Sequence, residues 1–507
     1  MSEDDSILVL TTREFDWWLS MQEVTPAIER VWTSIGQFSR ENVRMLCVPL
    51  APETEQRLQT SVSRLERIVI TVVGAGTVKA ALLLRLQMKV AAPMIIYIYG
   101  DPTNGLHAFG ALADVLTEQD LFVVSCEAEA VTVRCCFPNA RVSVIPFPLV
   151  DQFKVNGGEL DTKHETARLA YVGRVSEQKN LHTLLFALWI LRTSYGRLPR
   201  MTLDVYGGED NFGSPNMGLT YPNYGTYLQR LAELLGLADM VTWHGFKPRD
   251  WLFDNVHLEP HIFVSPTLHS DENFGSSVLA SLVNGHQVVT TAWGGHFGFQ
   301  EWFPQQLTLV PVHRSTMGPV VDPVLLANAI LRAINQLPAI AVKYASLERA
   351  RAEFSESTVA RRTFELLSLP GGESVPLKKS LTQRYIDERR ALFGGTRRIY
   401  VDYKDPVAQI FFEAYGMKKP LTFDEESRYV LPPWASYSTH VLRIADPHRG
   451  NQSFSLGAGI SKPLDVITCP AMNTCRLPES LVKSLVTQGY AFSLPPALAA
   501  KANIQAR

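Results

Sequence analysis

Two cationic residues follow one apolar run, and both types suit the departure of a phosphate group. Arg174 and Lys179 stand in the segment YVGRVSEQKN, directly past a strand-like run. Arginine offers a two-pronged guanidinium and lysine a movable point charge, and both bind phosphate oxygens well. Cations fixed beside a leaving group stabilise it most as its negative charge grows, which happens in the transition state. The pair suits chemistry in which a phosphate or diphosphate leaves, and a solvated basic loop is the alternative for either residue alone.

A carboxylate and a helix start stand further along the chain. The segment Glu272-Asn273-Phe274-Gly275 follows an apolar run and a polar turn, and a helix-like segment begins at Ser276. The first N–H groups of a helix have no carbonyl partner and carry the positive end of the helix dipole, so they bind anions. Gly275 has no Cβ, which lets a ligand lie against the backbone. We expect the Glu272 carboxylate to accept hydrogen bonds from ligand hydroxyls in this crevice.

These segments together resemble the donor site of retaining GT-B glycosyltransferases of the group 1 or family 4 type. Arg174 and Lys179 fit the signature G-R-x-x-x-x-K, and the later segment fits the first half of E-x-F-G-x-x-x-x-E. The resemblance implies catalytic roles for Glu272, Arg174 and Lys179. It also implies that the donor is bound by Gly173, Gly207, Gly208, Phe246, Asn273, Phe274, Gly275 and Ser276. Ordinary core packing is the alternative role for Phe246.

Two positions depart from the family pattern. The second Glu of the motif, which usually holds the donor ribose, falls on Ala280, whose side chain accepts no hydrogen bond. Losing such a contact weakens binding by roughly 1–3 kcal/mol without abolishing chemistry. We expect a pocket beside Ala280 that is open or filled by a polar side chain from elsewhere. Where the family commonly has a His facing the sugar, Asp101 and the nearby His107 are the candidates, with a solvated loop histidine as the alternative for His107.

Twelve short apolar runs would position these residues. Their Ile- and Val-rich composition without alternation is typical of parallel strands buried on both faces, and the segments between them suit helices. Such strand–helix alternation favours doubly wound α/β domains, which bind ligands at the carboxyl ends of their strands. The runs are Ile7–Thr11, Val43–Pro49, Ile68–Val73, Met94–Tyr99, Phe122–Ser125 and Val142–Pro146, then Leu169–Val172, Leu203–Tyr206, Val241–Trp243, Ile262–Val264, Val288–Thr291 and Leu307–Val310.

The sequence thus predicts an α/β chain with a GT-B fold, in which two Rossmann-like doubly wound domains face a cleft. Residues 1–150 would form the acceptor-side domain, and residues 151–370 the donor-binding domain, closed by the helical stretch Arg349–Leu367. Residues 371–507 would form a C-terminal extension whose fold the sequence does not reveal. Its start is basic, with seven Lys or Arg in residues 376–398.

The composition is that of a globular protein with two or three domains. The chain has 507 residues, of which 46% are hydrophobic and 19% charged, and its net charge of −2 gives no general reason to expect nucleic acid. Six cysteines are few for this length, which favours a reduced, cytoplasmic protein, and for Cys469 and Cys475 a thiol pair or disulfide is favoured over a metal site. We expect no secretory signal and no transmembrane segment, and peripheral membrane contact stays open.

The leading hypothesis is a cytoplasmic glycosyltransferase that moves a sugar from a nucleotide-diphosphate donor to an unidentified acceptor, such as a glycan, a glycolipid or a small molecule. By the resemblance, transfer would retain configuration and need no metal. No cofactor is expected, because the nucleotide sugar is a substrate. Two alternatives stay open. Ala280 and the absent His are consistent with an impaired scaffold or binding protein. The basic segment is consistent with a macromolecular acceptor, either protein or nucleic acid, although a solvated helix face is the simpler interpretation.

Overall fold

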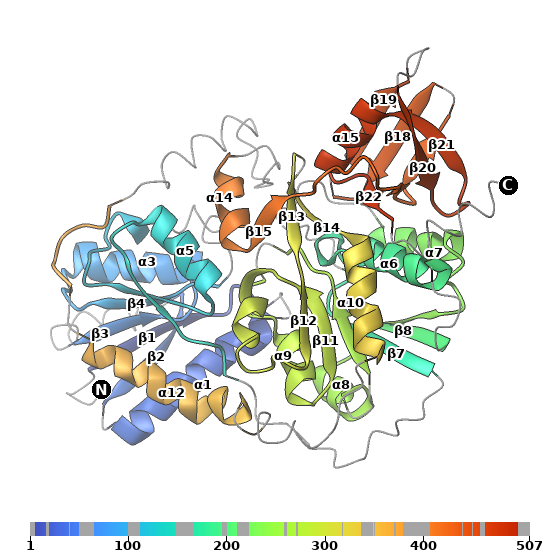
Figure 1. Cartoon of the computed structure of the whole chain (residues 1–507). Helices are drawn as coiled ribbons and strands as arrows, with labels where there is room; N and C mark the ends of the chain where they lie inside the picture. The colour runs from blue at the N-terminus through green and yellow to red at the C-terminus, as the bar shows by residue number, and fades with distance from the viewer. Residues whose placement is uncertain are drawn as a thin grey trace. The chain divides into compact units, whose positions relative to one another are not determined.

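The computed structural model divides the chain into two compact units (Figure 1). Unit 1 combines Met1–Gln152 with Glu348–Ile399, and unit 2 combines Phe153–Leu347 with Tyr400–Arg507. The structure describes residues 6–16, 20–39, 41–49, 65–99, 112–148, 166–194, 200–209, 223–257, 261–269, 272–316, 318–335, 348, 350–369, 372–378, 406–438, 440–448, 450–456 and 462–494.

Unit 1 is built on a six-stranded sheet in which all neighbouring strands are parallel. The strand order is β2-β1-β3-β4-β5-β6, with helices in the connections. Strands β1, β4 and β5 are buried along their whole length, which explains their unbroken apolar sequences. The elements are β1 (Ile7–Thr12), α1 (Met21–Ser39), β2 (Val43–Val48), β3 (Arg67–Ile70), α3 (Ala75–Leu82), the π-helical turn Leu83–Gln87, β4 (Met94–Tyr97), β5 (Leu121–Val124), α5 (Glu127–Cys136) and β6 (Arg141–Val144).

A helix from far along the chain completes unit 1. Helix α12 (Glu356–Glu365), followed by the 3-10 turn Leu366–Ser368, packs against α1 (Figure 1). Arg30 of α1 forms an ion pair with Glu356 at 2.9 Å, and the rings of Phe38 and Phe364 meet edge to face at 5.6 Å. We expected the stretch Arg349–Leu367 to close the second domain. Instead it groups with unit 1, because its apolar face, which includes the fully buried Val359, fits α1.

Unit 2 contains a second six-stranded parallel sheet, in the order β12-β11-β10-β7-β8-β9. Numbered along the chain, this is the 3-2-1-4-5-6 order of dinucleotide-binding folds, and its strand order reverses between β7 and β10. The elements are β7 (Thr166–Val172), the 3-10 turn Glu177–Lys179, α6 (Leu181–Ser194), β8 (Arg200–Tyr206), α7 (Tyr224–Leu234), β9 (Val241–Gly245), α8 (Arg249–Asn255), β10 (Ile262–Ser265), α9 (Ser276–Val283), β11 (Gln287–Thr291), the 3-10 turn Gly294–Phe299, β12 (Leu307–Val310) and α10 (Pro323–Asn335). The prediction of two Rossmann-like doubly wound α/β domains is confirmed, and all twelve predicted strands are present; that the domains face a cleft stays a prediction.

Residues after Pro406 add to unit 2 in two ways. First, α14 (Pro406–Ala414) leads into β15 (Met417–Pro420), which pairs in parallel with β13 (Val312–Ser315) of the hairpin that β13 forms with β14 (Gly318–Val321). Second, two small sheets and α15 (Glu479–Thr487) share one core that contains Leu442, Leu477 and Val482. The sheet strands are β16 (Tyr429–Leu431), β20 (Pro463–Thr468), β21 (Thr474–Pro478) and β22 (Phe492–Ser493) in one, and β17 (Ala435–Tyr437), β18 (Val441–Asp446) and β19 (Gly450–Ser455) in the other.

Helix α6 lies between the large sheet and this C-terminal part (Figure 1). Nearly all its residues are buried, because α7, α10 and aromatic side chains of the C-terminal part cover it. Phe186 contacts Trp434 and Phe492 edge to face, at 5.9 and 6.4 Å between ring centroids. Because α6 is covered on all sides, its apolar residues are not confined to one face, as they are in a surface helix.

Cys469 directly follows β20, Cys475 lies at the start of β21, and both are free thiols. Burial raises the pKa of both, to about 11 for Cys475, so they stay protonated. Within the described residues, no helix has the length and apolar character needed to cross a membrane.

Candidate functional site

Strand ends bring the predicted cations and carboxylate together at one edge of the unit 2 sheet. Strand β7 ends at Val172 and continues into Gly173 and Arg174, while β10 ends at Ser265 and leads to Glu272. These two strands are neighbours, and the strand order reverses between them. Ligands of open parallel sheets bind beyond the carboxyl ends of the strands at such a reversal. The sequence-predicted residues therefore lie where this fold places ligands.

The Glu272 carboxylate is paired with Lys179. Lys179 Nζ donates a hydrogen bond to Glu272 Oε2, and Thr267 Oγ1 donates a second one at 3.0 Å. The side chains of Lys179 and Glu272 are only 15% and 12% exposed, so water screens the pair weakly. Burial alone would raise the pKa of Glu272, but the charge of the Lys179 ammonium and its hydrogen bond outweigh burial and hold that pKa well below its usual range. The carboxylate is therefore an ionised acceptor.

Arg174 contacts His269, a residue that sequence reasoning did not single out. Arg174 Nη2 lies within hydrogen-bond distance of His269 Nε2. A guanidinium only donates, so Nε2 must accept and the ring proton must be on Nδ1. Burial, and then the charges of Arg174 and Lys179, lower the pKa of His269 well below its usual value, which agrees with a neutral ring. The only sequence signal was its position three residues before Glu272.

His296 is a second imidazole beside the carboxylate that the sequence analysis did not propose. Its Nδ1 donates to the Thr291 carbonyl at 3.2 Å and lies 3.0 Å from Thr290 Oγ1, so the ring is fixed in orientation. Its Nε2 is 3.8 Å from Glu272 Oε1 and has no hydrogen-bond partner among the described residues. Burial lowers the pKa of His296 despite the attraction of Glu272. Only Gly294-Gly295 before it marked this place in the sequence.

Two glycines allow the loops around Glu272 to pack closely. Gly275 directly precedes α9 with φ +84°, and a Cβ there would lie 2.6 Å from His296 Cδ2. Gly294 has φ +56°, and a Cβ there would lie 2.1 Å from the Glu272 carbonyl oxygen. The sequence suggested that Gly275 leaves room for a ligand. The structure adds that it leaves room for His296 and adopts a backbone conformation that L side chains rarely take.

The other predicted donor-site residues lie around this centre or outside the described residues. Phe274 is buried and meets Phe299 edge to face at 5.4 Å, so its side chain packs in the core. Phe246 is 56% exposed and lies beside Gly208. The remaining placements are as follows: Gly173 and Gly207 follow β7 and β8, Asn273 is half-buried, Ser276 is exposed at the start of α9, and Asp101, His107 and residues 379–398 lie outside the described residues.

Ala280 lies half-buried on α9, and a polar side chain is close to it. Asn284, one turn further on, donates from Nδ2 to the Ala280 carbonyl oxygen at 2.7 Å. This amide comes from the same helix rather than from another element. The pocket that we expect beside Ala280 stays a prediction.

The C-terminal part supports the loop that carries Gly294. Gly294 N donates to the Tyr415 carbonyl at 2.8 Å, directly after α14. The Trp293 ring packs against Phe412 and Tyr415, at 6.1 and 5.7 Å, and its Nε1 donates to the His269 carbonyl at 2.8 Å. The extension therefore holds the backbone of Gly294 directly, and it packs against the Trp293 ring that binds the His269 carbonyl.

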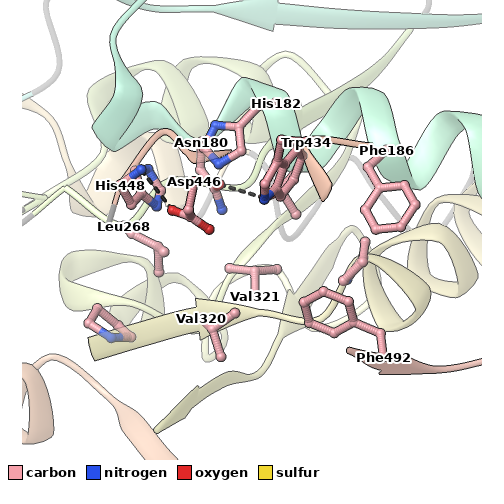
Figure 2. Close-up of a pocket in the computed structure, with 13 residues that line it drawn as sticks. Asn180, His182, Phe186, Leu268, Val320, Val321, Trp434, Asp446, His448 and Phe492 are labelled. Atoms are coloured by element: carbon pink, nitrogen blue, oxygen red, sulfur yellow. Dashed lines mark hydrogen bonds between the residues drawn. The ribbon is translucent and has the colours of Figure 1, made fainter. Parts of the chain in front are cut away.

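A pocket is lined in part by the two loops that carry Lys179 and His269 (Figure 2). Its walls include Asn180, which follows Lys179, and Leu268, which precedes His269. From the C-terminal part, Trp434 and His448 close it (Figure 2). His448 Nε2 donates to the Glu177 carbonyl, which ties β18 and its following turn to the loop of Lys179.

The comparisons with known proteins bear on this same segment. Residues 156–298 match the family model of Glycosyl transferases group 1. That range contains every cation, carboxylate, imidazole and glycine of the site described above. No curated protein matches the chain.

The solved structures that are similar to the chain include the following two. A lipopolysaccharide outer core galactosyltransferase in its apo form is 12% identical, with 72% of this chain and 100% of that chain covered and a TM-score of 0.47. A structure of trehalose-6-phosphate from E. coli bound with UDP-2-fluoro glucose is 11% identical, with 72% and 99% covered and a TM-score of 0.49.

Proposed function

We propose that the protein is a glycosyltransferase that moves a sugar from a phosphate-activated donor to an acceptor. The observation that carries the proposal is the Lys179–Glu272 pair beside Arg174, at the strand-order reversal of a Rossmann-like sheet. The family match over residues 156–298 covers the same residues and supports it.

Each charged group has a role in this reaction. Glu272 is ionised and accepts hydrogen bonds, so it would bind hydroxyls of the transferred sugar. A guanidinium has five N–H donors, so Arg174 can contact His269 and a phosphate oxygen together. An arriving phosphate would share Lys179 with Glu272, and the shared ammonium would stabilise the leaving group as its charge grows. The N–H groups at the start of α9 would add to this stabilisation.

The first test is donor binding and turnover. The purified full chain is screened against a panel of nucleotide sugars by thermal shift, because a ligand that binds only the folded state raises the midpoint. The best donor is then followed for sugar release to water and to candidate acceptors. Arg174→Ala should lower turnover by about 100-fold or more, as loss of one preorganised charge-stabilising donor does. Lys483→Ala, an exposed lysine on α15, is the control and should leave turnover unchanged.

The finer points of the reaction rest on the sequence resemblance and are proposals as well. Retention of configuration is tested by the anomeric proton coupling of the first product formed. A catalytic step without metal is tested by comparing initial rates with and without added Mg²⁺. The nucleotide is tested by competition among nucleoside diphosphates, and cytoplasmic location with peripheral membrane contact by cell fractionation.

A donor-binding protein without transferase activity is the second candidate, and Ala280 favours it. The two functions differ in the thermal-shift and turnover tests, since a binding protein shows the shift without release of sugar. Ala280→Glu restores the motif and should tighten a nucleotide-sugar donor about tenfold, the effect of one hydrogen bond to a charged group. Ala280→Leu fills similar space without an acceptor and serves as the control. Equal affinity for all three proteins would show that the ribose does not reach this position.

A further inference from the structure

Three imidazoles gather at the amino end of the unit 2 sheet, the edge opposite the candidate functional site. His261 directly precedes β10, His286 directly precedes β11, and His257 follows α8. The register of β10 and β11 pairs Ile262 with Gln287, which places His261 beside His286. Their rings stack with centroids 3.8 Å apart, and the His257 ring centroid lies 6.1 Å from each.

The ring nitrogens are close enough to share one ion. One nitrogen from each histidine lies within 4.8 Å of the other two. Nitrogens bound to tetrahedral zinc at about 2.0–2.1 Å are about 3.4 Å apart, so binding would draw the rings together by roughly an ångström. We propose that His257, His261 and His286 form a binding site for a divalent first-row transition-metal cation, with zinc as the best fit.

The hydrogen bond of His286 prepares its ring to be a ligand. His286 Nε2 lies 2.9 Å from the His257 carbonyl oxygen. A carbonyl only accepts, so Nε2 carries the proton and Nδ1 of the neutral ring carries the lone pair. Metal-binding histidines usually donate their other N–H in this way, which fixes the tautomer and the ring orientation.

His257 has the features of a buried ligand. It is 6% exposed, and its Nδ1 has no hydrogen-bond partner among the described residues. A buried polar nitrogen without a partner is costly, and a metal ion would satisfy it.

The donor set selects the class of cation. Three imidazoles suit zinc, copper, iron or nickel, whereas magnesium and calcium prefer oxygen ligands. Three protein ligands leave a fourth tetrahedral position for water. Bound there, the ion would join the end of α8 to the starts of β10 and β11. The spacing His257-x-x-x-His261 is itself one that zinc sites use.

The binding test uses the full chain, purified without a metal-affinity step. Metal content is measured directly, and chelator-stripped protein is then titrated with ZnCl₂ by calorimetry. We expect one zinc per chain and a rise in the thermal midpoint with Zn²⁺ but not with Mg²⁺. Co²⁺ added to stripped wild-type protein should give the intense visible absorption of tetrahedral coordination. No zinc uptake, or a weak octahedral Co²⁺ spectrum, would overturn the proposal, and neither measurement needs a variant to fold.

Variants then assign the ligands. His257→Ala and His286→Ala should each weaken zinc binding by at least about 100-fold. Losing only an outer-shell partner of a ligand can weaken metal binding by up to about 100-fold, and losing the ligand itself should cost at least as much. His440→Ala removes an exposed histidine elsewhere in unit 2 and should leave the affinity unchanged. Circular dichroism checks that each variant folds, and His286→Gln replaces His286→Ala if it does not. Zinc affinity that survives in a folded variant of this trio would exclude that residue as a ligand and overturn the three-histidine site.

Discussion

Lys179 and Glu272 form a mostly buried ion pair, so removing one partner leaves the other as an unpaired buried charge, which destabilises the folded state. Replacing Lys179 with Met leaves the Glu272 carboxylate buried without its main counter-charge, which should destabilise the protein by about 3–5 kcal/mol at pH 7. In the wild type the pKa of Glu272 is depressed, so the stability from this pair is present above the unfolded pKa and is lost only as the pH falls through the folded value. In Lys179→Met the pKa should rise instead, so this variant should gain stability as the pH falls from 7 to 5.

Urea unfolding of wild type and Lys179→Met at pH 7 and pH 5 measures this change in stability. The double variant Lys179→Met with Glu272→Gln removes both charges and should recover most of the lost stability while staying inactive. If the double variant were as unstable as Lys179→Met alone, the loss would come from packing rather than from an unpaired carboxylate.

Asp322 should weaken the protein as the pH rises. Its buried carboxylate accepts hydrogen bonds from the N–H groups of Val324 and Leu325 at the start of α10, yet burial raises its pKa to about 6. Between the ordinary value of 3.8 and about 6, the folded state holds a proton that the unfolded state has lost, so stability falls with rising pH. Asp322→Asn keeps an acceptor and should raise stability at pH 7 by up to about 3 kcal/mol.

Unfolding midpoints at pH 4 and pH 7 test the Asp322 prediction. The exposed Asp239, changed to Asn, is the control and should alter neither midpoint. A gain from Asp322→Asn that is equal at both pH values would show that ionisation is not its cause.

At the scale of elements, the segment after α14 braces the functional site. Tyr415 is 1% exposed and packs against Trp293, while its carbonyl holds Gly294. Tyr415→Ala should cost about 3–5 kcal/mol of stability, as large-to-small changes of buried aromatics do, and should weaken donor binding because Gly294 packs on Glu272. Tyr415→Phe keeps the ring and should retain donor affinity. Tyr437→Ala, at an exposed ring, is the control. Unchanged donor affinity in folded Tyr415→Ala would refute the brace.

The elements also show what sequence patterns can predict. The twelve parallel strands were predictable because buried strands of this kind are continuous apolar runs. Arg174, Lys179 and Glu272 stood out because their spacing matches a motif that this fold presents at the strand ends. His269 and His296 did not, because no local pattern distinguishes a ligand-side histidine from a solvated one. Helix α12 has an apolar face, but an apolar face alone does not predict which of the two domains the helix packs against.

At the scale of the whole molecule, unit 1 depends on a helix that the chain adds after most of unit 2. Val359 of α12 is fully buried against this unit. Val359→Asp places an unpaired charge there, which costs several kcal/mol. Hydrogen exchange should then rise in α1 and β1–β6 but not in β7–β12. Ser357→Asp places a charge at an exposed position of the same helix and is the control. Equal loosening of both sheets would mean that α12 supports unit 2 as well.

The split of unit 1 has a consequence for how the protein is made. A ribosome releases Met1–Gln152 first, then all of Phe153–Leu347, and only afterwards the residues of α12. At about 5–20 residues per second, on the order of tens of seconds pass between the two halves of unit 1. During that interval the side of α1 that carries Ser34 and Phe38 has no α12 to contact it. We therefore expect α1 to lack this partner helix, and to be open to chaperones on that side, until translation has passed α12.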